Sequence, residues 1–98
     1  MTISSSTDGD KQIINIQGRF DFSLQSDFRK AYESSDSNSH FIIDFSGAEY
    51  LDSSALGMLL LLRDYAGGDS ANIDIMHCRN EIKNILEISN FQKLFKIS

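Results

Sequence analysis

Two apolar runs of different character stand close together in the middle of the chain. Residues 40–45 form a short, nearly continuous apolar run with β-branched and aromatic members, which predicts a strand buried on both faces. Residues 55–66 form a longer apolar run with helical spacing, which predicts a helix. A buried strand followed by a helix is typical of a sheet with mainly parallel strands. We therefore predict an α/β fold.

Polar residues stand at the point where this helix begins. Asp52 or Ser53 can accept hydrogen bonds from the free backbone N–H groups of the first turn, and Ser54 then lies where the helix dipole is positive. A phosphate on Ser54 would be stabilised there by the amides and the dipole. The alternative is an ordinary capped loop, which spacing alone favours.

The rest of the chain alternates strands and helices. Strands are expected over residues 1–6, 11–17, 40–45, 72–76 and 94–97, and helices over residues 23–33, 53–66 and 80–90. The Asp-Gly turn within residues 7–10 predicts a hairpin, so the first strand is expected to be an antiparallel edge strand. The later strands are expected to pair in parallel through three right-handed crossover helices. The predicted order is β-β-α-β-α-β-α-β in one domain, residues 1–98.

Short polar segments are expected to separate these elements. Gly18 should end the second strand, and residues 19–23 should form the next loop, with Ser23 as the N-cap of the first helix. Residues 46–49 are expected to form the loop before the second helix. The serine-rich residues 34–39 are expected to be a solvated loop, with a cluster of phosphorylation sites as the alternative.

The first and third predicted helices each carry one apolar stripe. The stripes consist of Leu24, Phe28, Ala31 and Tyr32 in the first helix and of Ile82, Ile85, Leu86 and Ile88 in the third. Phe91 and Leu94 are expected to pack beneath the third helix, which Asn90 caps at its C-terminal end.

The second predicted helix has more apolar surface than one contact with a sheet needs. Its sheet-facing side is predicted to consist of Ala55, Leu59, Leu62 and Ala66, with Gly57 and Asp64 toward solvent. Its flanks carry Met58, Leu60, Leu61 and Tyr65. This excess is either covered by neighbouring helices or binds a partner. Leu61 lies nearest the polar side, so its exposure distinguishes coverage by neighbouring helices from binding of a partner.

Composition and charge exclude several classes of function. The 98 residues carry a net charge of −5, which opposes binding to nucleic acid or to an anionic membrane surface. The single Cys78 can form no internal disulfide, and beside His77 it is expected to be a small buried thiol rather than a metal ligand. The N-terminus has no charged-then-apolar leader, and no apolar run approaches about 18 residues. We therefore expect a soluble, cytoplasmic chain with no metal site and no membrane insertion.

The chain also lacks the motifs of common catalytic sites. It has no Gly-x-Ser-x-Gly elbow, no Gly-x-Gly-x-x-Gly turn, no phosphate-binding Gly-Lys-Ser/Thr loop and no paired His–Glu metal spacing. A serine nucleophile needs a base within reach, and both histidines, His40 and His77, are predicted at strand edges. We therefore predict that the protein is not an enzyme. A small hydrolase using Ser53 or Ser54 is the alternative that these absences disfavour.

Several stretches together carry a family resemblance. Residues 51–57, Leu-Asp-Ser-Ser-Ala-Leu-Gly, follow a buried strand and open a helix, and in this setting they resemble the phosphorylation motif of STAS domains, the anti-sigma factor antagonists of bacterial partner-switching systems. Residues 18–21, Gly-Arg-Phe-Asp, resemble the Gly-x-x-Asp turn after the family's second strand. Residues 41–45 are similar to its central strand, and residues 85–95 to its last helix and strand. The resemblance covers nearly the whole chain. It therefore favours Ser54 as a phosphorylation site over the interpretation of residues 52–54 as an ordinary capped loop.

Two features depart from the family's pattern. The family commonly has Gly after the second Ser, where this chain has Ala55, which is the better helix former. Many relatives continue into a C-terminal helix beyond the last strand, which is absent here. The resemblance therefore implies that part of the family's surface is missing or differently covered.

The resemblance implies a protein switch. In such systems the unphosphorylated domain binds an anti-sigma factor with serine kinase activity, which phosphorylates the second Ser of the motif, here Ser54, with Ser53 as the weaker candidate. A serine phosphatase reverses the modification. Asp52 and Ser53 would shape the loop, and Asp21 would lie beside the site. The expected partner contacts on the helix are Met58, Leu61 and Tyr65. ATP would belong to the kinase, so this chain needs no cofactor.

The switch has a simple electrostatic basis. A phosphate adds nearly two negative charges at pH 7. On an acidic domain, at the rim of an apolar contact, this charge favours release of an acidic or hydrophobic partner surface. The alternative within the same fold is a constitutive interaction subunit of a lipid-transport complex at the inner membrane, in which Ser54 is only a cap.

Overall fold

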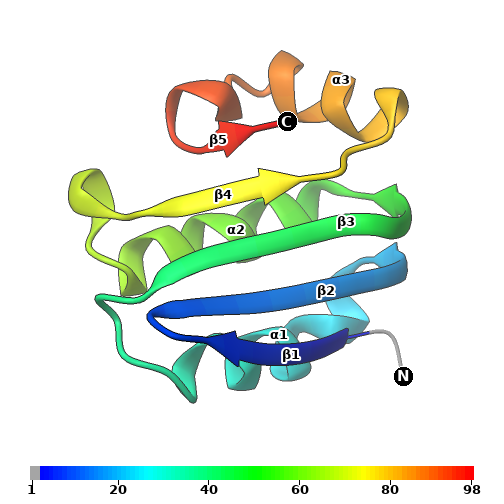
Figure 1. Cartoon of the computed structure of the whole chain (residues 1–98). Helices are drawn as coiled ribbons and strands as arrows, with labels where there is room; N and C mark the ends of the chain where they lie inside the picture. The colour runs from blue at the N-terminus through cyan, green and yellow to red at the C-terminus, as the bar shows by residue number, and fades with distance from the viewer. Residues whose placement is uncertain (1–2) are drawn as a thin grey trace.

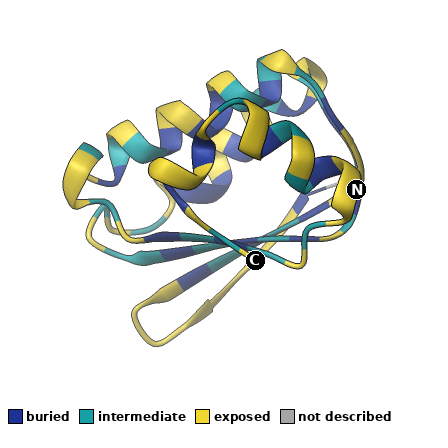
Figure 2. Ribbon diagram, turned by 90° about the horizontal axis from the view of Figure 1, so that it is seen from above, coloured by how far each residue is buried: buried dark blue, intermediate teal, exposed yellow. Residues whose placement is uncertain are grey.

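The computed structural model describes residues 3–98 and shows one five-stranded sheet with its helices on one side (Figures 1 and 2). The strands are β1 (Ile3–Asp8), β2 (Lys11–Phe20), β3 (His40–Leu51), β4 (Ile73–Met76) and β5 (Lys96–Ile97). The helices are α1 (Gln25–Glu33), α2 (Ser53–Tyr65) and α3 (Asn80–Ile88), with 3-10 turns η1 (Phe22–Leu24), η2 (Gly68–Ser70) and η3 (Phe91–Lys93). Residues 1–2 of the predicted first strand lie outside the described residues.

The sheet topology follows the predicted order of elements. The strands lie side by side in chain order, β1 is antiparallel to β2, and the other three pairings are parallel. Each parallel pair is joined by one helix (Figure 1). The predicted α/β class and the antiparallel edge strand are confirmed.

Strand β2 continues through Gly18, where its end was predicted. Gly18 has a φ of 78°, which residues with a Cβ rarely adopt, and the register between β2 and β3 shifts between this residue and Arg19. The glycine therefore bends β2 without ending it, and Phe20 still pairs with Leu51. The predicted break was wrong because a neighbouring strand continues to pair with this segment.

Strand β3 is longer than predicted for the same reason. Residues 47–51 pair with residues 17–20 of β2, so the loop expected over residues 46–49 is wrong. This segment has few residues that favour strands, and its conformation is decided by pairing rather than by propensity.

The buried face of β3 differs from the prediction as well. Phe41, Ile43 and Phe45 are fully buried against the helices, whereas Ile42 and Asp44 are only partly covered. The expectation of a strand buried on both faces was wrong, because all three helices lie on one side and the other face of the sheet is open (Figure 2).

The first helix begins through a different cap from the one predicted. Asp21, not Ser23, accepts the capping hydrogen bond, from the backbone N–H of Ser23. The turn η1 then leads into α1 without a further side-chain cap at Leu24. The chain therefore starts this helical segment two residues earlier than the Ser23 cap implied.

The C-terminal segment corrects two predicted core residues. Ile88 is 82% exposed and Leu94 is 38% exposed, whereas Phe91 and Phe95 are each 5% exposed. Asn90 has a φ of 61°, as expected for a left-handed residue after a helix. The turn at Asn90 redirects the chain, so the aromatic rings rather than Ile88 and Leu94 pack on the core.

The core lies between the sheet and the helices. Its fully buried large side chains are Phe20, Phe28, Phe41, Phe45, Ile14, Ile16, Ile43, Leu59, Leu62, Ile75, Ile82 and Leu86. Each such side chain contributes roughly 1.5–3 kcal/mol through burial. The stripe predicted on α1 and the sheet-facing side predicted on α2 are buried as expected.

Candidate functional site

The first turn of α2 begins at Asp52. Its backbone is extended (φ −113°, ψ −177°), and its carboxylate Oδ1 accepts hydrogen bonds from the Ser54 hydroxyl at 2.6 Å and from the Ala55 N–H at 3.0 Å. These hydrogen bonds, the one from Ser54 foremost, lower the pKa of Asp52 below its ordinary value. Of the two residues predicted as possible caps, Asp52 is the one that caps, and Ser53 is exposed.

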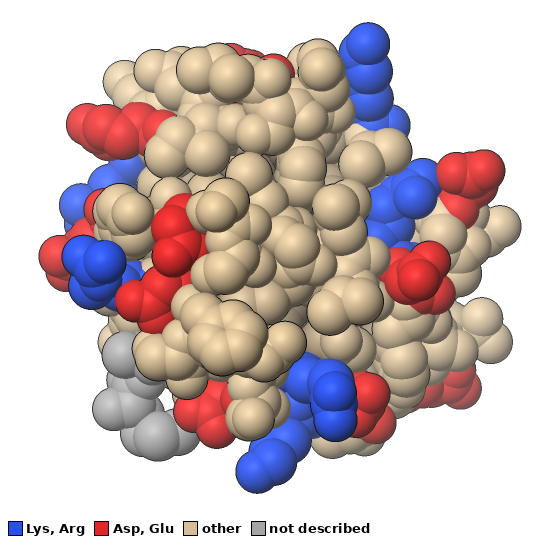
Figure 3. Space-filling model, turned by 180° about the vertical axis from the view of Figure 1, so that it is seen from behind, with Lys and Arg blue, Asp and Glu red and all other residues tan. Residues whose placement is uncertain are grey.

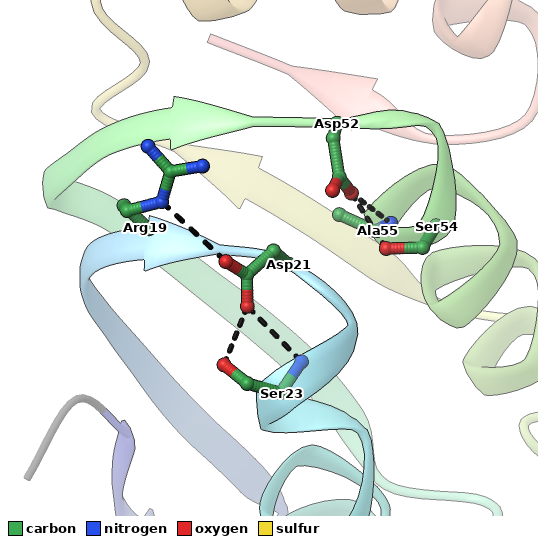
Figure 4. A network of polar contacts seen from close by, with 6 residues as sticks. All are labelled: Arg19, Asp21, Ser23, Asp52, Ser54 and Ala55. Carbon is green, nitrogen blue, oxygen red and sulfur yellow. Dashed lines mark hydrogen bonds and ion pairs between the residues drawn. The ribbon is translucent and has the colours of Figure 1, made fainter.

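Asp21 repeats this arrangement at the end of the neighbouring strand (Figure 4). Its Oδ1 accepts from both the hydroxyl and the N–H of Ser23, and the hydrogen bond from the hydroxyl is the main reason that the pKa of Asp21 is lowered. Because Phe20 and Leu51 are register partners, Asp21 and Asp52 follow them side by side. The Asp21 carboxylate is close enough to oppose ionisation of Asp52.

One cation lies beside this pair of carboxylates. Arg19 Nε is 3.4 Å from Asp21 Oδ2, and its guanidinium carbon is 4.3 Å from the centre of the Tyr50 ring. The Arg19 side chain is 67% exposed, so the ion pair contributes little to stability. Arg19 and Tyr50 are register partners on β2 and β3, which explains their stacking.

The helix side of the molecule carries a broad surface with few charged side chains, and both acidic and basic side chains lie at its margin (Figure 3). On α2, Leu60 is 42% and Leu61 is 51% exposed, and in η1 Phe22 is 65% exposed. We call these three residues the apolar patch. Exposed apolar residues mark interaction sites where they lie next to one another, as Leu60 and Leu61 do in the chain, whereas a single exposed apolar residue is common.

A small groove between α1 and α2 adjoins this patch at Leu61. It is lined by Gln25, Phe28, Arg29, Tyr32, Met58 and Leu61. Met58 is only 4% exposed and lies at its floor, where it fills space between the helices. Leu61 is the side chain that sits between this groove and the open surface.

The predicted site residues divide into two groups. Asp21, Asp52, Ser53 and Ser54 come together at the ends of β2 and β3, and Leu61 lies exposed on the same helix. Tyr65 belongs to the interior instead: its hydroxyl donates to the Ser35 carbonyl at 2.7 Å, and its ring packs against Tyr32 and Phe41.

Sequence reasoning missed Arg19 and Phe22, which flank Asp21. Phe22 was assigned to a connecting loop, where its exposure could not be foreseen, and Arg19 was placed in the same loop. The signal that could have found them is their position on either side of the acid in the Gly-x-x-Asp turn, since that turn lies beside the start of α2.

Within the described part of the chain, both histidines form hydrogen bonds with carboxylates other than those beside Ser54. His40 Nε2 lies 2.9 Å from Asp74 Oδ2, and His77 Nδ1 lies 3.0 Å from Asp44 Oδ1, both on the open face of the sheet. Burial raises the pKa of the Cys78 thiol to about 11. Within residues 3–98 no three His, Cys, Asp or Glu side chains are grouped so that they could hold a metal ion.

None of the helices that the structure describes is both long and apolar enough to cross a membrane.

Comparison with known proteins places the chain in a family. Residues 3–96 match the model of the family described as "Mlab, STAS domain". A STAS-domain containing protein of Pseudomonas aeruginosa (strain UCBPP-PA14) is 54% identical over 99 residues, covering 100% of this chain and 98% of the relative.

Solved structures share the fold at low sequence identity. The anti-sigma factor antagonist SpoIIAA in its unphosphorylated form superimposes with a TM-score of 0.75 at 13% identity, over 98% of this chain and 86% of SpoIIAA. An anti-sigma factor antagonist of Mycobacterium paratuberculosis gives 0.82 at 15% identity, over 98% and 83% of the two chains. A sulfate transporter family protein of Wolinella succinogenes gives 0.75 at 12% identity, over 90% and 73%. The chain belongs to the STAS domain family.

Proposed function

We infer that this chain acts as an anti-sigma factor antagonist whose binding to a partner is switched by phosphorylation of Ser54. The observation that carries the proposal is the Ser54 hydroxyl, held 2.6 Å from the Asp52 carboxylate at the first turn of α2. The same helix presents exposed Leu60 and Leu61. One helix thus joins a modifiable hydroxyl to an apolar binding surface.

The modification changes the charge of the site. The partner kinase would transfer the γ-phosphoryl group of ATP: the Ser54 Oγ–P bond forms, the bond between β-phosphate oxygen and γ-phosphorus breaks, and ADP and the hydroxyl proton leave. Asp52 then loses the donor that lowers its pKa and faces a phosphate with nearly two negative charges. Asp21 adds a further negative charge nearby. The partner would therefore meet a strongly acidic margin at the apolar patch and dissociate.

This proposal makes the chain a binding protein without catalytic activity. Its partners would be a cytoplasmic anti-sigma factor with serine kinase activity and a serine phosphatase, with Asp21, Asp52 and Ser53 shaping the site and Leu61 contacting the partner. The net charge of −5 argues against a nucleic acid partner.

Mass spectrometry after incubation with the cognate kinase and ATP tests the proposal. Phosphate is expected on Ser54 and on no residue of a Ser54→Ala variant, with Ser53→Ala as the matched control that stays modified. In a pull-down, Ser54→Ala should retain the kinase in the presence of ATP and Ser54→Asp should release it. Absence of phosphate from Ser54, or full release of Ser54→Ala, would overturn the proposal.

A second candidate is a constitutive interaction subunit, as in a lipid-transport complex at the inner membrane. Two observations favour it: the matching family is described as "Mlab, STAS domain", and the two carboxylates beside Ser54 disfavour an added phosphate. In this case Ser54 serves only the cap, and Ser54→Asp should bind the partner nearly as well as the unmodified chain. The same pull-down therefore separates the two candidates.

A further inference from the structure

The two edges of the sheet differ in how much backbone they leave open (Figure 1). β5 pairs with β4 over only two residues, and a very short edge strand offers little to another chain. β1 is six residues long and pairs with β2 without a shift in register. It contains no proline, lysine or arginine, and residues 4–7 are uncharged. Long edge strands are commonly protected by proline, charge or a bulge, and β1 has none of these within its central residues.

The hairpin shows which backbone groups of β1 are free. A two-residue turn, Gly9-Asp10, with Gly9 at φ 64°, joins β1 to β2. The residues that flank such a turn form a hydrogen-bonded pair, and such pairs alternate along antiparallel strands. The N–H and C=O groups of Ile3, Ser5 and Thr7 therefore point away from β2.

A groove of about 250 Å³ lies between this free edge and α1. Buried Ile3 and Ala31 form its apolar part, and exposed Asp27 and Lys30 stand on its α1 side. Ser5 lines it from β1 and leaves room for another backbone. A groove between an edge strand and a helix suits an extended chain that pairs with the strand and turns every second side chain toward the helix.

The position of α1 is fixed by contacts beneath the edge. Thr7 Oγ1 donates to the buried Gln12 Oε1 at 2.8 Å, and Gln12 Nε2 donates to the Ala31 carbonyl at 3.3 Å. The helix is thereby tied to the hairpin on the helix side of β1. A second copy of this chain, brought edge to edge by a two-fold axis normal to the sheet, would carry its own α1 to that same side. The second α1 would be an obstacle to this pairing, and a single extended segment carries no such helix.

We propose that the free edge of β1 binds an extended segment of a partner protein, in which small apolar residues alternate with polar or basic ones. The apolar residues would lie over Ile3 and Ala31. Basic residues are favoured over acidic ones because the exposed charges at the hairpin end are two acidic residues, Asp8 and Asp10, against one Lys11, and the chain carries a net charge of −5. This binding surface is independent of Ser54 and of the apolar patch.

A synthetic peptide tests the inference: alternating valine and threonine, about seven residues long, with lysine at both ends. Titrated into the isotope-labelled chain, it should shift the amide resonances of Ile3, Ser5 and Thr7. Ser5→Pro removes the outward N–H and keeps the pairing with β2, because proline is tolerated at such edge positions. It should raise the dissociation constant about tenfold or more.

The matched control is Ser5→Ala, which keeps the N–H and should bind like the unmodified chain, as should Ser54→Ala. Thermal unfolding of Ser5→Pro confirms that the variant is folded. Equal affinity of Ser5→Pro and Ser5→Ala would overturn the inference. Changes in amide resonances confined to α2, or no change at about 1 mM peptide, would also overturn the inference. A third contrary result would be a dimer of the free chain, detected by sedimentation, that is lost in Ser5→Pro.

Discussion

At the scale of single residues, one carboxylate oxygen organises the start of α2. Asp52 Oδ1 accepts from the Ser54 hydroxyl and the Ala55 N–H, and Asp21 Oδ1 accepts from both donors of Ser23. A hydroxyl that already donates to a carboxylate is oriented, and its oxygen keeps its lone pairs for another reaction. Ser54 is therefore distinguished from exposed Ser53 by its hydrogen bond rather than by accessibility.

The Ser54 hydroxyl should control the pKa of Asp52. In Ser54→Ala the pKa of Asp52 should rise toward its ordinary value, because the largest cause of its lowering is removed. Carboxyl titration by NMR measures it, and Ser53→Ala should leave it unchanged. A pKa that stays low in Ser54→Ala would contradict this role of the hydrogen bond.

The same shift predicts how stability depends on pH. The folded-state pKa of Asp52 lies below its unfolded value of about 3.9. Ionised Asp52 therefore stabilises the fold above that unfolded pKa, and the stabilisation is lost as pH falls through the folded pKa. Denaturant unfolding between about pH 5 and pH 2 should show a smaller loss for Ser54→Ala than for the unmodified chain.

At the scale of elements, the ends of α2 are defined by local chemistry. Asp52 caps the first turn, and Gly67, at φ 111°, follows the last turn at Ala66. Between them Gly57 is exposed, and a Cβ added there would meet nothing within 4 Å. The helix is therefore well delimited but contains one residue that weakens it.

Loss of the cap should destabilise the protein. Asp52→Ala should lower the free energy of unfolding by about 1 kcal/mol, because two donors lose their acceptor. Asp52→Asn should cost less, since its side-chain oxygen can still accept. Urea unfolding at neutral pH compares the two, and equal losses would argue against the capping hydrogen bonds as the cause.

Two glycines should respond in opposite directions to the same substitution. Gly57→Ala should raise the free energy of unfolding by about 0.5–1 kcal/mol, because alanine favours the helix and the site is open. Gly18→Ala should lower it by about 1–2 kcal/mol, because φ is 78° there. Thermal unfolding of both variants checks the pair. If Gly18→Ala were as stable as the unmodified chain, β2 would not need the bend at residue 18.

At the scale of the whole molecule, the one-sided arrangement of helices decides which apolar residues are free. α2 lies against the sheet through Leu59 and Leu62, each fully buried. α1 covers Met58 on one flank, while Leu60 and Leu61 remain exposed. The broad apolar surface of α2 is therefore only partly covered by its neighbours, and the rest remains available for a partner.

Substitutions of two adjacent leucines of α2 should have different effects, one on stability and the other on partner binding. Leu62→Ala should lower the free energy of unfolding by about 2–5 kcal/mol, since it leaves a cavity in the core. Leu61→Ala should change it by less than about 0.5 kcal/mol, because the residue is 51% exposed. Under either candidate function, Leu61→Ala should still weaken partner binding in the pull-down. A large loss of stability in Leu61→Ala would place this side chain in the core instead.

The sequence by itself determined the order of elements, the antiparallel edge strand, and the sheet-facing side of α2. These depend on local periodicity, on the Asp-Gly turn and on the polar start of α2, which act within a few residues of the chain. The same local signals located Asp52 and Ser54. Their grouping with Asp21 came from the family resemblance, because the two segments are distant in the chain.

Only the tertiary structure decided the rest. β2 and β3 extend beyond their predicted ends because each pairs with the other, and the open face of the sheet follows from helices that all lie on one side. The stacking of Arg19 on Tyr50, the exposure of Leu61 and the groove at β1 likewise depend on which elements meet in space. Such contacts join residues far apart in the chain, and local patterns carry no information about them.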